Sequence, residues 1–164
     1  MTDETESPEF TLTRTFEAPV TTVWQAWTDP RHLTHWFHPA GFSTPLDSIH
    51  VDLRVGGRYR YTMIEDATGA AHPTGGEFLE VAPPSRLVFT WASPEAAPGA
   101  SPVATVTLDG DGERTRMVFT LRGTAGRPGD DGVHDGWQQA VEILAVHLGA
   151  LEETSGPALH REGL

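Results

Sequence analysis

Alternation of apolar and polar side chains predicts two well-marked strands. Residues 10–16 alternate between apolar side chains and Thr or Arg, as a half-buried strand requires. Residues 58–64 alternate more clearly, because Tyr59, Tyr61 and Met63 share one face while two arginines occupy the other. Both segments are therefore expected to lie in a sheet with one buried face.

Further strands are predicted along the middle of the chain. They span residues 75–81, 86–91, 103–108 and 115–122, and residues 42–55 add short apolar stretches ahead of a hairpin turn at Gly56-Gly57. The segments between them are rich in Pro, Gly, Ser and Asp, as loops are. These spacings predict an antiparallel meander.

Helical spacing of apolar residues predicts two short helices and one long helix. The first short helix starts after Pro19 and ends at Thr28, and the second covers residues 31–37 after the cap Asp29-Pro30. The long helix covers residues 137–151, and its apolar stripe consists of Trp137, Val141, Leu144, Leu148 and Leu151.

This order of elements predicts an α+β fold. A sheet of six or seven antiparallel strands is expected to wrap around the long helix, which has nowhere else to bury its stripe. One domain is expected over residues 10–154, with flexible ends at 1–9 and 155–164. A curved sheet that grips a helix seldom closes completely, so an apolar cavity is expected between the two.

Charge and composition narrow the classes of partner. The chain has 164 residues and a formal net charge of −12, which argues against nucleic acid and anionic membranes. It has no cysteine, and therefore no disulfide or thiol chemistry. No apolar run reaches the roughly 18 residues of a membrane span, and the acidic N-terminus does not resemble a signal peptide, so a cytoplasmic protein is expected.

Polar clusters give little support for a metal or cofactor. His32, His35 and His38 cannot all converge from one regular helix, because a step of three residues turns the helix by about 300°. The acidic turn 109–113 lacks the Gly and Glu that a calcium loop needs further along, which favours a hairpin turn. An acid–base cluster of Asp47, His50, Asp52 and His72 is explained equally well by exposed strand positions. No cofactor and no metal are expected.

Several strings of residues resemble one known family. They lie at residues 16–30, 35–37 with 41–42, 52–60, 76–91, 105–108, 112–116 and 136–137. Together they resemble the SRPBCC or START-like superfamily, in the branch named for the C-terminal domain of the activator of the heat-shock protein 90 ATPase. The resemblance covers residues 10–151 and points to a bacterial single-domain member. It implies a helix-grip fold with a deep hydrophobic pocket between the sheet and the long helix.

The resemblance also suggests what the pocket does. Members of the superfamily bind lipids, sterols, polyketides or hormones, and some are cyclases. The leading hypothesis is a binding protein for a hydrophobic or amphipathic small molecule, and the alternatives are a cyclase-like or hydrolase-like enzyme and a chaperone-related or stress-related interaction module. The namesake's N-terminal chaperone-binding domain has no counterpart in this sequence, which argues against a chaperone partner. The predicted pocket residues are Trp24, Trp36, Phe42, Tyr59, Tyr61, Met63, Phe78, Trp91, Phe119, Trp137, Val141 and Leu144.

Overall fold

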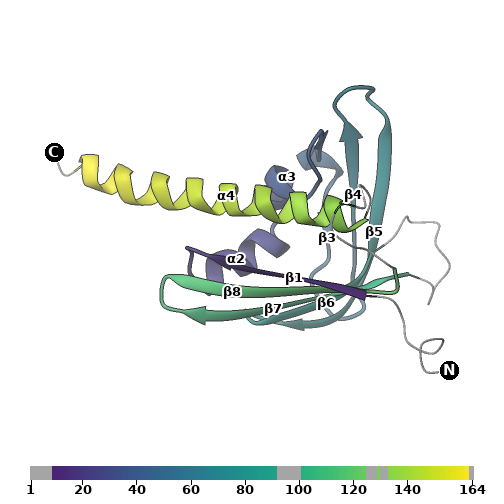
Figure 1. Ribbon diagram of the computed structural model, residues 1–164, viewed down its shortest axis with the longest axis horizontal. Coiled ribbons are helices and arrows are strands. Elements are labelled where there is room, and N and C mark those ends of the chain that lie inside the picture. The colour runs from purple at the N-terminus through teal and green to yellow at the C-terminus, as the bar shows by residue number, and fades with distance from the viewer. Residues whose placement is uncertain (1–8, 92–100, 125–128, 130–132, 163–164) are drawn as a thin grey trace.

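The computed structural model describes residues 9–91, 101–124, 129 and 133–162. Its elements follow the predicted α+β order, which is thereby confirmed (Figure 1). The bounds are β1 Glu9–Phe16, α2 Val20–Thr28, α3 Pro30–Trp36, β2 Phe42–Ser43, η1 Leu46–Ser48, β3 His50–Val51, β4 Arg58–Glu65, β5 Ala71–Ala82, β6 Arg86–Thr90, β7 Val103–Asp111, β8 Arg114–Arg122 and α4 Val133–Glu162. The predictions made for residues 1–8 and for the loop at 92–100 lie outside the described residues.

Within the described part of the chain, eight antiparallel strands form one sheet. Their order is β1-β8-β7-β6-β5-β4-β2, and β3 also pairs with β4. The strand count exceeds the predicted six or seven because the apolar stretch 42–55 divides into β2, the 3-10 helix η1 and β3. β5 begins at Ala71, earlier than predicted, because it pairs with β4 as far as Ile64.

The turn between β7 and β8 is the hairpin that its composition predicts. Asp111 pairs with Arg114, so only Gly112 and Glu113 form the turn. Gly112 has a φ of +65°, a conformation that glycine adopts without the strain a Cβ would cause.

α4 lies across the inner face of the bent sheet, and Figure 1 shows β4 and β5 rising beside its N-terminal end. The helix begins at Val133, one turn before the predicted start at Trp137, and continues to Glu162. Residues 155–162, predicted as a tail, are therefore helical in backbone. The apolar periodicity stops where the helix passes the edge of the sheet (Figure 1), whereas backbone hydrogen bonds can continue without a buried face. No described helix is long and apolar enough to cross a membrane.

The core lies between α4 and the sheet, with α2 and α3 closing one side. On α4, Trp137, Val141, Leu144 and Leu148 are each at most 4% exposed. The predicted stripe is confirmed at these four positions, whereas the side chain of Leu151 lies outside the described part. Burying each large apolar side chain contributes roughly 1.5–3 kcal/mol, so the stripe holds the helix on the sheet.

Candidate functional site

A small apolar cavity lies between β4, the C-terminal end of α3 and the N-terminal end of α4. Its volume is about 150 Å³. It is lined by Phe37, His38, Pro39, Tyr61, Met63, Trp91, Val133, Gly136, Trp137 and Ala140. An apolar hollow of about 150 Å³ can hold a molecule the size of benzene. The expected hollow therefore exists, but it occupies only one end of the contact between helix and sheet.

The cavity brings together four of the twelve predicted pocket residues. These are Tyr61, Met63, Trp91 and Trp137. Seven others are at most 9% exposed and pack in the core away from the cavity: Trp24, Trp36, Tyr59, Phe78, Phe119, Val141 and Leu144. Phe42 lies on β2, where its ring packs against His72 with centroids 5.7 Å apart. The remaining wall residues, Phe37, His38, Pro39, Val133, Gly136 and Ala140, were not predicted.

Stacked aromatic rings fill the middle of the contact between helix and sheet. The ring centroid of Trp137 lies 4.5 Å from that of Phe119 and 6.4 Å from that of Trp27. These rings occupy the space between Trp137 of α4 and Phe119 of β8. Because each aromatic side chain fills a large volume, the same residues that suggested a spacious pocket in the sequence occupy most of the space themselves.

Two small residues keep the start of α4 open. Gly136 and Ala140 are four residues apart, so they share a face of the helix and both border the cavity. A Cβ added to Gly136 would meet only Pro39 Cβ, at 3.8 Å. A pair of small residues at the head of an otherwise bulky stripe was the signal in the sequence that could have located the cavity.

Tyr61 and Trp137, which both line the cavity, differ in whether their polar group forms a hydrogen bond. The Oη of Tyr61 accepts a hydrogen bond from Trp91 Nε1 at 2.9 Å. Burial raises the pKa of Tyr61, so its phenol stays neutral. The indole N–H of Trp137 is buried and has no hydrogen-bond partner among the described residues. A buried donor left unpaired costs about 1–3 kcal/mol.

His38 places a neutral imidazole in the same wall. Its Nδ1 lies 3.0 Å from Thr44 Oγ1, and that hydroxyl already donates to the carbonyl oxygen of Phe37. His38 Nδ1 must therefore be the donor, which leaves Nε2 as the unprotonated acceptor. Burial lowers the pKa of His38, so this neutral form persists at pH 7.

A separate histidine cluster joins α3 to α4. His32 Nδ1 lies 3.0 Å from His147 Nε2, and the His35 ring stacks on that of His147 with centroids 5.0 Å apart. His38 lies apart from this cluster, bonded to Thr44. His147 could not be assigned to the cluster from sequence, because its position depends on how two helices pack. In the described part, no group of three or more His or acidic side chains could hold a metal ion.

This cluster should make stability depend on pH. Burial and the nearby His32 and His35 lower the pKa of His147 to about 4, against an ordinary value of 6.5. As pH falls from 6.5 toward 4, His147 becomes protonated in the unfolded chain but stays neutral in the folded protein. Protonation therefore favours the unfolded state, and the free energy of unfolding decreases. Because His147 is partly exposed to solvent, we expect a loss of only about 1–2 kcal/mol.

Urea unfolding at pH 7.5 and pH 4.5 measures this effect. His147→Gln should lose less stability than the wild type between the two pH values. His50→Gln, at an exposed position on β3, serves as the control and should follow the wild type. An unchanged pH dependence in His147→Gln would remove the cluster as its cause.

Comparison with known proteins agrees with this architecture. The family model described as "Activator of Hsp90 ATPase homolog 1-like protein" matches residues 17–149. A solved structure from Chromobacterium violaceum is 28% identical with a TM-score of 0.72, and the alignment covers 84% of this chain and 95% of that one. A structure from Nitrosomonas europaea is also 28% identical, with a TM-score of 0.73 and coverage of 88% and 96%.

A more distant match is titled as an HSP90 activator from Plasmodium falciparum. It is 24% identical with a TM-score of 0.63, and the alignment covers 87% of this chain and 96% of that one. At that identity the likeness shows the fold alone. A comparison with curated protein sequences gives no significant match. Since the family model spans α2 to the buried part of α4, the chain belongs to the Activator of Hsp90 ATPase homolog 1-like family of the SRPBCC superfamily and has its helix-grip fold.

Proposed function

We propose that the protein binds a small hydrophobic or amphipathic molecule in the cavity between β4, α3 and α4. The observation that carries the proposal is the apolar hollow of about 150 Å³ beside Trp137. The indole N–H of Trp137 is itself buried, so it is the apolar part of the ring that borders the hollow. The wall is mainly apolar, which favours a compact hydrophobic ligand.

The size of the cavity limits the affinity. A benzene-sized ligand buries about as much apolar surface as one large side chain, which contributes roughly 1.5–3 kcal/mol. Even an efficient small ligand gains at most about 1.5 kcal/mol per heavy atom, and association costs oppose this gain. We therefore expect dissociation constants in the high micromolar to millimolar range for single-ring probes.

Matched probes test the proposal directly. Cyclohexanone and cyclohexane have nearly the same shape, but only the ketone carries a polar oxygen that must give up its hydration on entering an apolar cavity. Both should quench or shift tryptophan emission, since Trp91 and Trp137 line the cavity, and the alkane should bind at least as tightly as the ketone. If neither changes the emission or the melting temperature at millimolar concentration, the cavity is not a binding site for such molecules.

A cavity-filling variant should abolish this binding. Gly136→Leu places a branched side chain in the hollow, because a Cβ there has open space apart from Pro39. We expect probe affinity to fall at least tenfold while the protein stays folded, as judged by far-UV circular dichroism. Gly149→Leu is the matched control, because it makes the same change on the same helix where a Cβ meets nothing within 4 Å. Equal loss of affinity in both variants would contradict the proposed location.

An enzymatic use of the same cavity is the second candidate, and one observation favours it. His38 presents an unprotonated imidazole in the wall beside Tyr61, which suits a general base near neutral pH. Under this reading, His38→Gln would abolish turnover of a cyclisable or hydrolysable substrate and leave probe binding intact. Loss of both together would show only a structural role for His38.

A chaperone-related role would require a docking surface outside the cavity. The large apolar side chains that are most exposed in the described part do not gather on one element: Leu46 on η1, Leu53 and Val55 before β4, Leu79 on β5 and Val146 on α4. Because they come from different elements, no single described element presents an apolar face of the size that docking surfaces need. We therefore keep small-molecule binding as the proposed function.

A further inference from the structure

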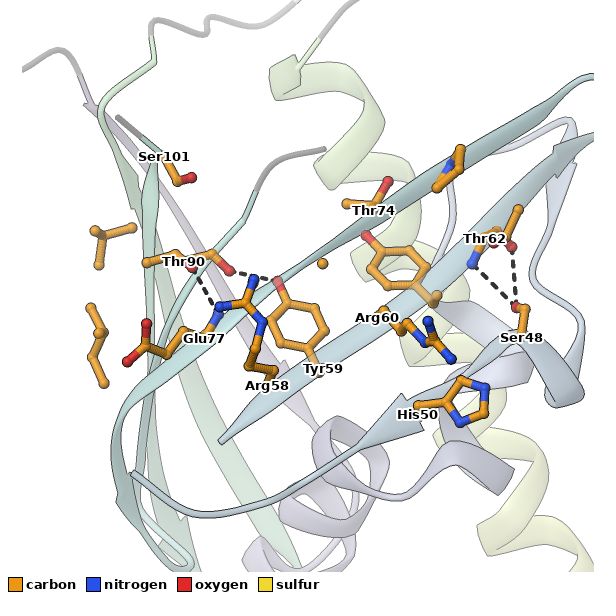
Figure 2. Close-up of a pocket in the computed structure, with 16 residues that line it drawn as sticks. Ser48, His50, Arg58, Tyr59, Arg60, Thr62, Thr74, Glu77, Thr90 and Ser101 are labelled. Carbon is orange, nitrogen blue, oxygen red and sulfur yellow. Dashed lines mark hydrogen bonds between the residues drawn. The ribbon is translucent and has the colours of Figure 1, made fainter. Parts of the chain in front are cut away.

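A second, larger groove runs along β4 and β5, and its lining shares only Tyr61 with that of the cavity (Figure 2). Its volume is about 960 Å³. Tyr59 and Tyr61 point into the core, so Arg58 and Arg60, which alternate with them along β4, face outward into this groove. The groove therefore differs from the apolar cavity in position and in the charge of its walls.

Arg58 and Arg60 differ from most other arginines of the protein. Six arginines pair with a carboxylate: Arg14, Arg31, Arg54, Arg86, Arg114 and Arg122. Within the described residues, neither Arg58 nor Arg60 has a carboxylate within ion-pair distance, although both are exposed. Glu77 is the cross-strand neighbour of Arg58, yet Figure 2 shows its carboxylate turned away from the guanidinium. The guanidinium groups of Arg58 and Arg60 therefore form no ion pair with a carboxylate of the described residues.

A third basic group lies beside them. His50 on β3 is the cross-strand neighbour of Arg60, which places the two side chains on the same face of the sheet. Arg58 and Arg60 are two residues apart on one strand, so their Cα atoms are separated by about 6.6 Å. Flexible guanidinium groups at that spacing can both reach one carboxylate or phosphate, and each can offer it two parallel N–H donors.

The floor of the groove is bare backbone. Gly75 and Gly76 carry no side chains because there is no room for them: an added Cβ would lie 2.4 Å from Tyr59 O at Gly75 and 2.0 Å from Thr90 O at Gly76. This packing keeps the space in front of Arg60, whose neighbour on β5 is Gly75, free of side chains. Leu79 borders the same groove and is 43% exposed, which adds an apolar wall next to the cations.

We propose that this groove binds an organic oxyanion, with Arg58 and Arg60 holding its carboxylate or phosphate group and Leu79 contacting its apolar part. A net charge of −12 repels anions from most of the surface, so binding must depend on these local cations. The site uses Arg58, Arg60 and Leu79, none of which lines the apolar cavity, so its failure would leave the proposed function untouched.

Isothermal titration calorimetry with matched eight-carbon probes tests this proposal. Octanoate and octyl phosphate carry the anionic group, and octanol is the neutral control. We expect the double variant R58Q/R60Q to bind the anionic probes at least tenfold more weakly and to leave octanol binding unchanged. R116Q is the matched control, because Arg116 is also exposed and forms no ion pair among the described residues; it should alter affinity less than twofold.

The results distinguish anion binding in this groove from binding in the apolar cavity. Tighter binding of octyl phosphate identifies a phosphate ester as the ligand class, and tighter binding of octanoate identifies a carboxylate. Either result supports the groove if R58Q/R60Q abolishes it and Gly136→Leu does not. The proposal is overturned if the wild type binds neither anion below about 1 mM, if R116Q loses as much affinity as the double variant, or if Gly136→Leu removes anion binding and so places the probe in the apolar cavity.

Discussion

Replacing Trp137 with alanine is expected to lower the free energy of unfolding by about 3–5 kcal/mol. Trp137 is 4% exposed, and its ring contacts Phe119 at 4.5 Å and Trp91 at 5.3 Å between centroids. The truncation would remove the ring that separates the cavity from the filled core. Urea unfolding followed by far-UV circular dichroism measures the loss, since the variant also loses a fluorescent reporter.

Trp137→Phe is the informative companion of this variant. It keeps an aromatic ring in contact with Phe119 but removes the indole N–H that has no partner among the described residues. Losing an unpaired buried donor offsets part of the lost packing, so we expect destabilisation below about 1.5 kcal/mol. A cost as large as that of Trp137→Ala would mean that the N–H is satisfied in the protein.

The second large effect is expected at Gly76, where alanine should destabilise the protein by about 3 kcal/mol, the upper range for overpacking. The added Cβ would lie 2.0 Å from Thr90 O and 2.5 Å from Thr90 Oγ1. Both atoms of Thr90 already accept hydrogen bonds, from Tyr59 Oη at 2.7 Å and from Glu77 N at 2.8 Å. The substitution would therefore push Thr90 away and break the hydrogen bonds by which β4 and β5 are joined to β6.

Gly136→Ala is the control for that experiment. Its added Cβ would meet only Pro39 Cβ at an ordinary 3.8 Å, and alanine favours a helix more than glycine by up to about 1 kcal/mol. Thermal and urea unfolding should therefore show the two Gly→Ala variants changing in opposite directions. Equal stability of both would contradict the close approach of Gly76 to β6.

The arrangement of elements was predictable because it rests on local patterns. Alternation along β4 set which residues face the core, and Tyr59 and Tyr61 are indeed buried while Arg58 and Arg60 are exposed. The cap predicted at Asp29 is present, since its carboxylate accepts a hydrogen bond from Arg31 N at 2.9 Å. Residues a few positions apart carry this information, so no knowledge of distant neighbours was needed.

The cavity wall was predictable only in part. Residue type suggested aromatics for a pocket wall, and the structure places Trp91 and Trp137 beside the hollow. It could not show that Phe119 and Leu144 pack in the filled core instead of lining the cavity, because filling depends on volumes contributed from separate elements. The small residues Gly136 and Ala140 mark where α4 leaves space, but the residues of the opposite wall come from separate elements and are known only from the structure.

The amino-acid sequence by itself determined the α+β architecture, the burial of one face of α4 and the membership of the SRPBCC superfamily, because periodicity and turn chemistry act over short stretches of chain. The tertiary structure alone decided where the hollow remains, that His147 joins His32 and His35, and that Arg58 and Arg60 lack acidic partners among the described residues. Those features depend on distances between side chains far apart in the chain, and such distances are set only when the sheet bends around the helix.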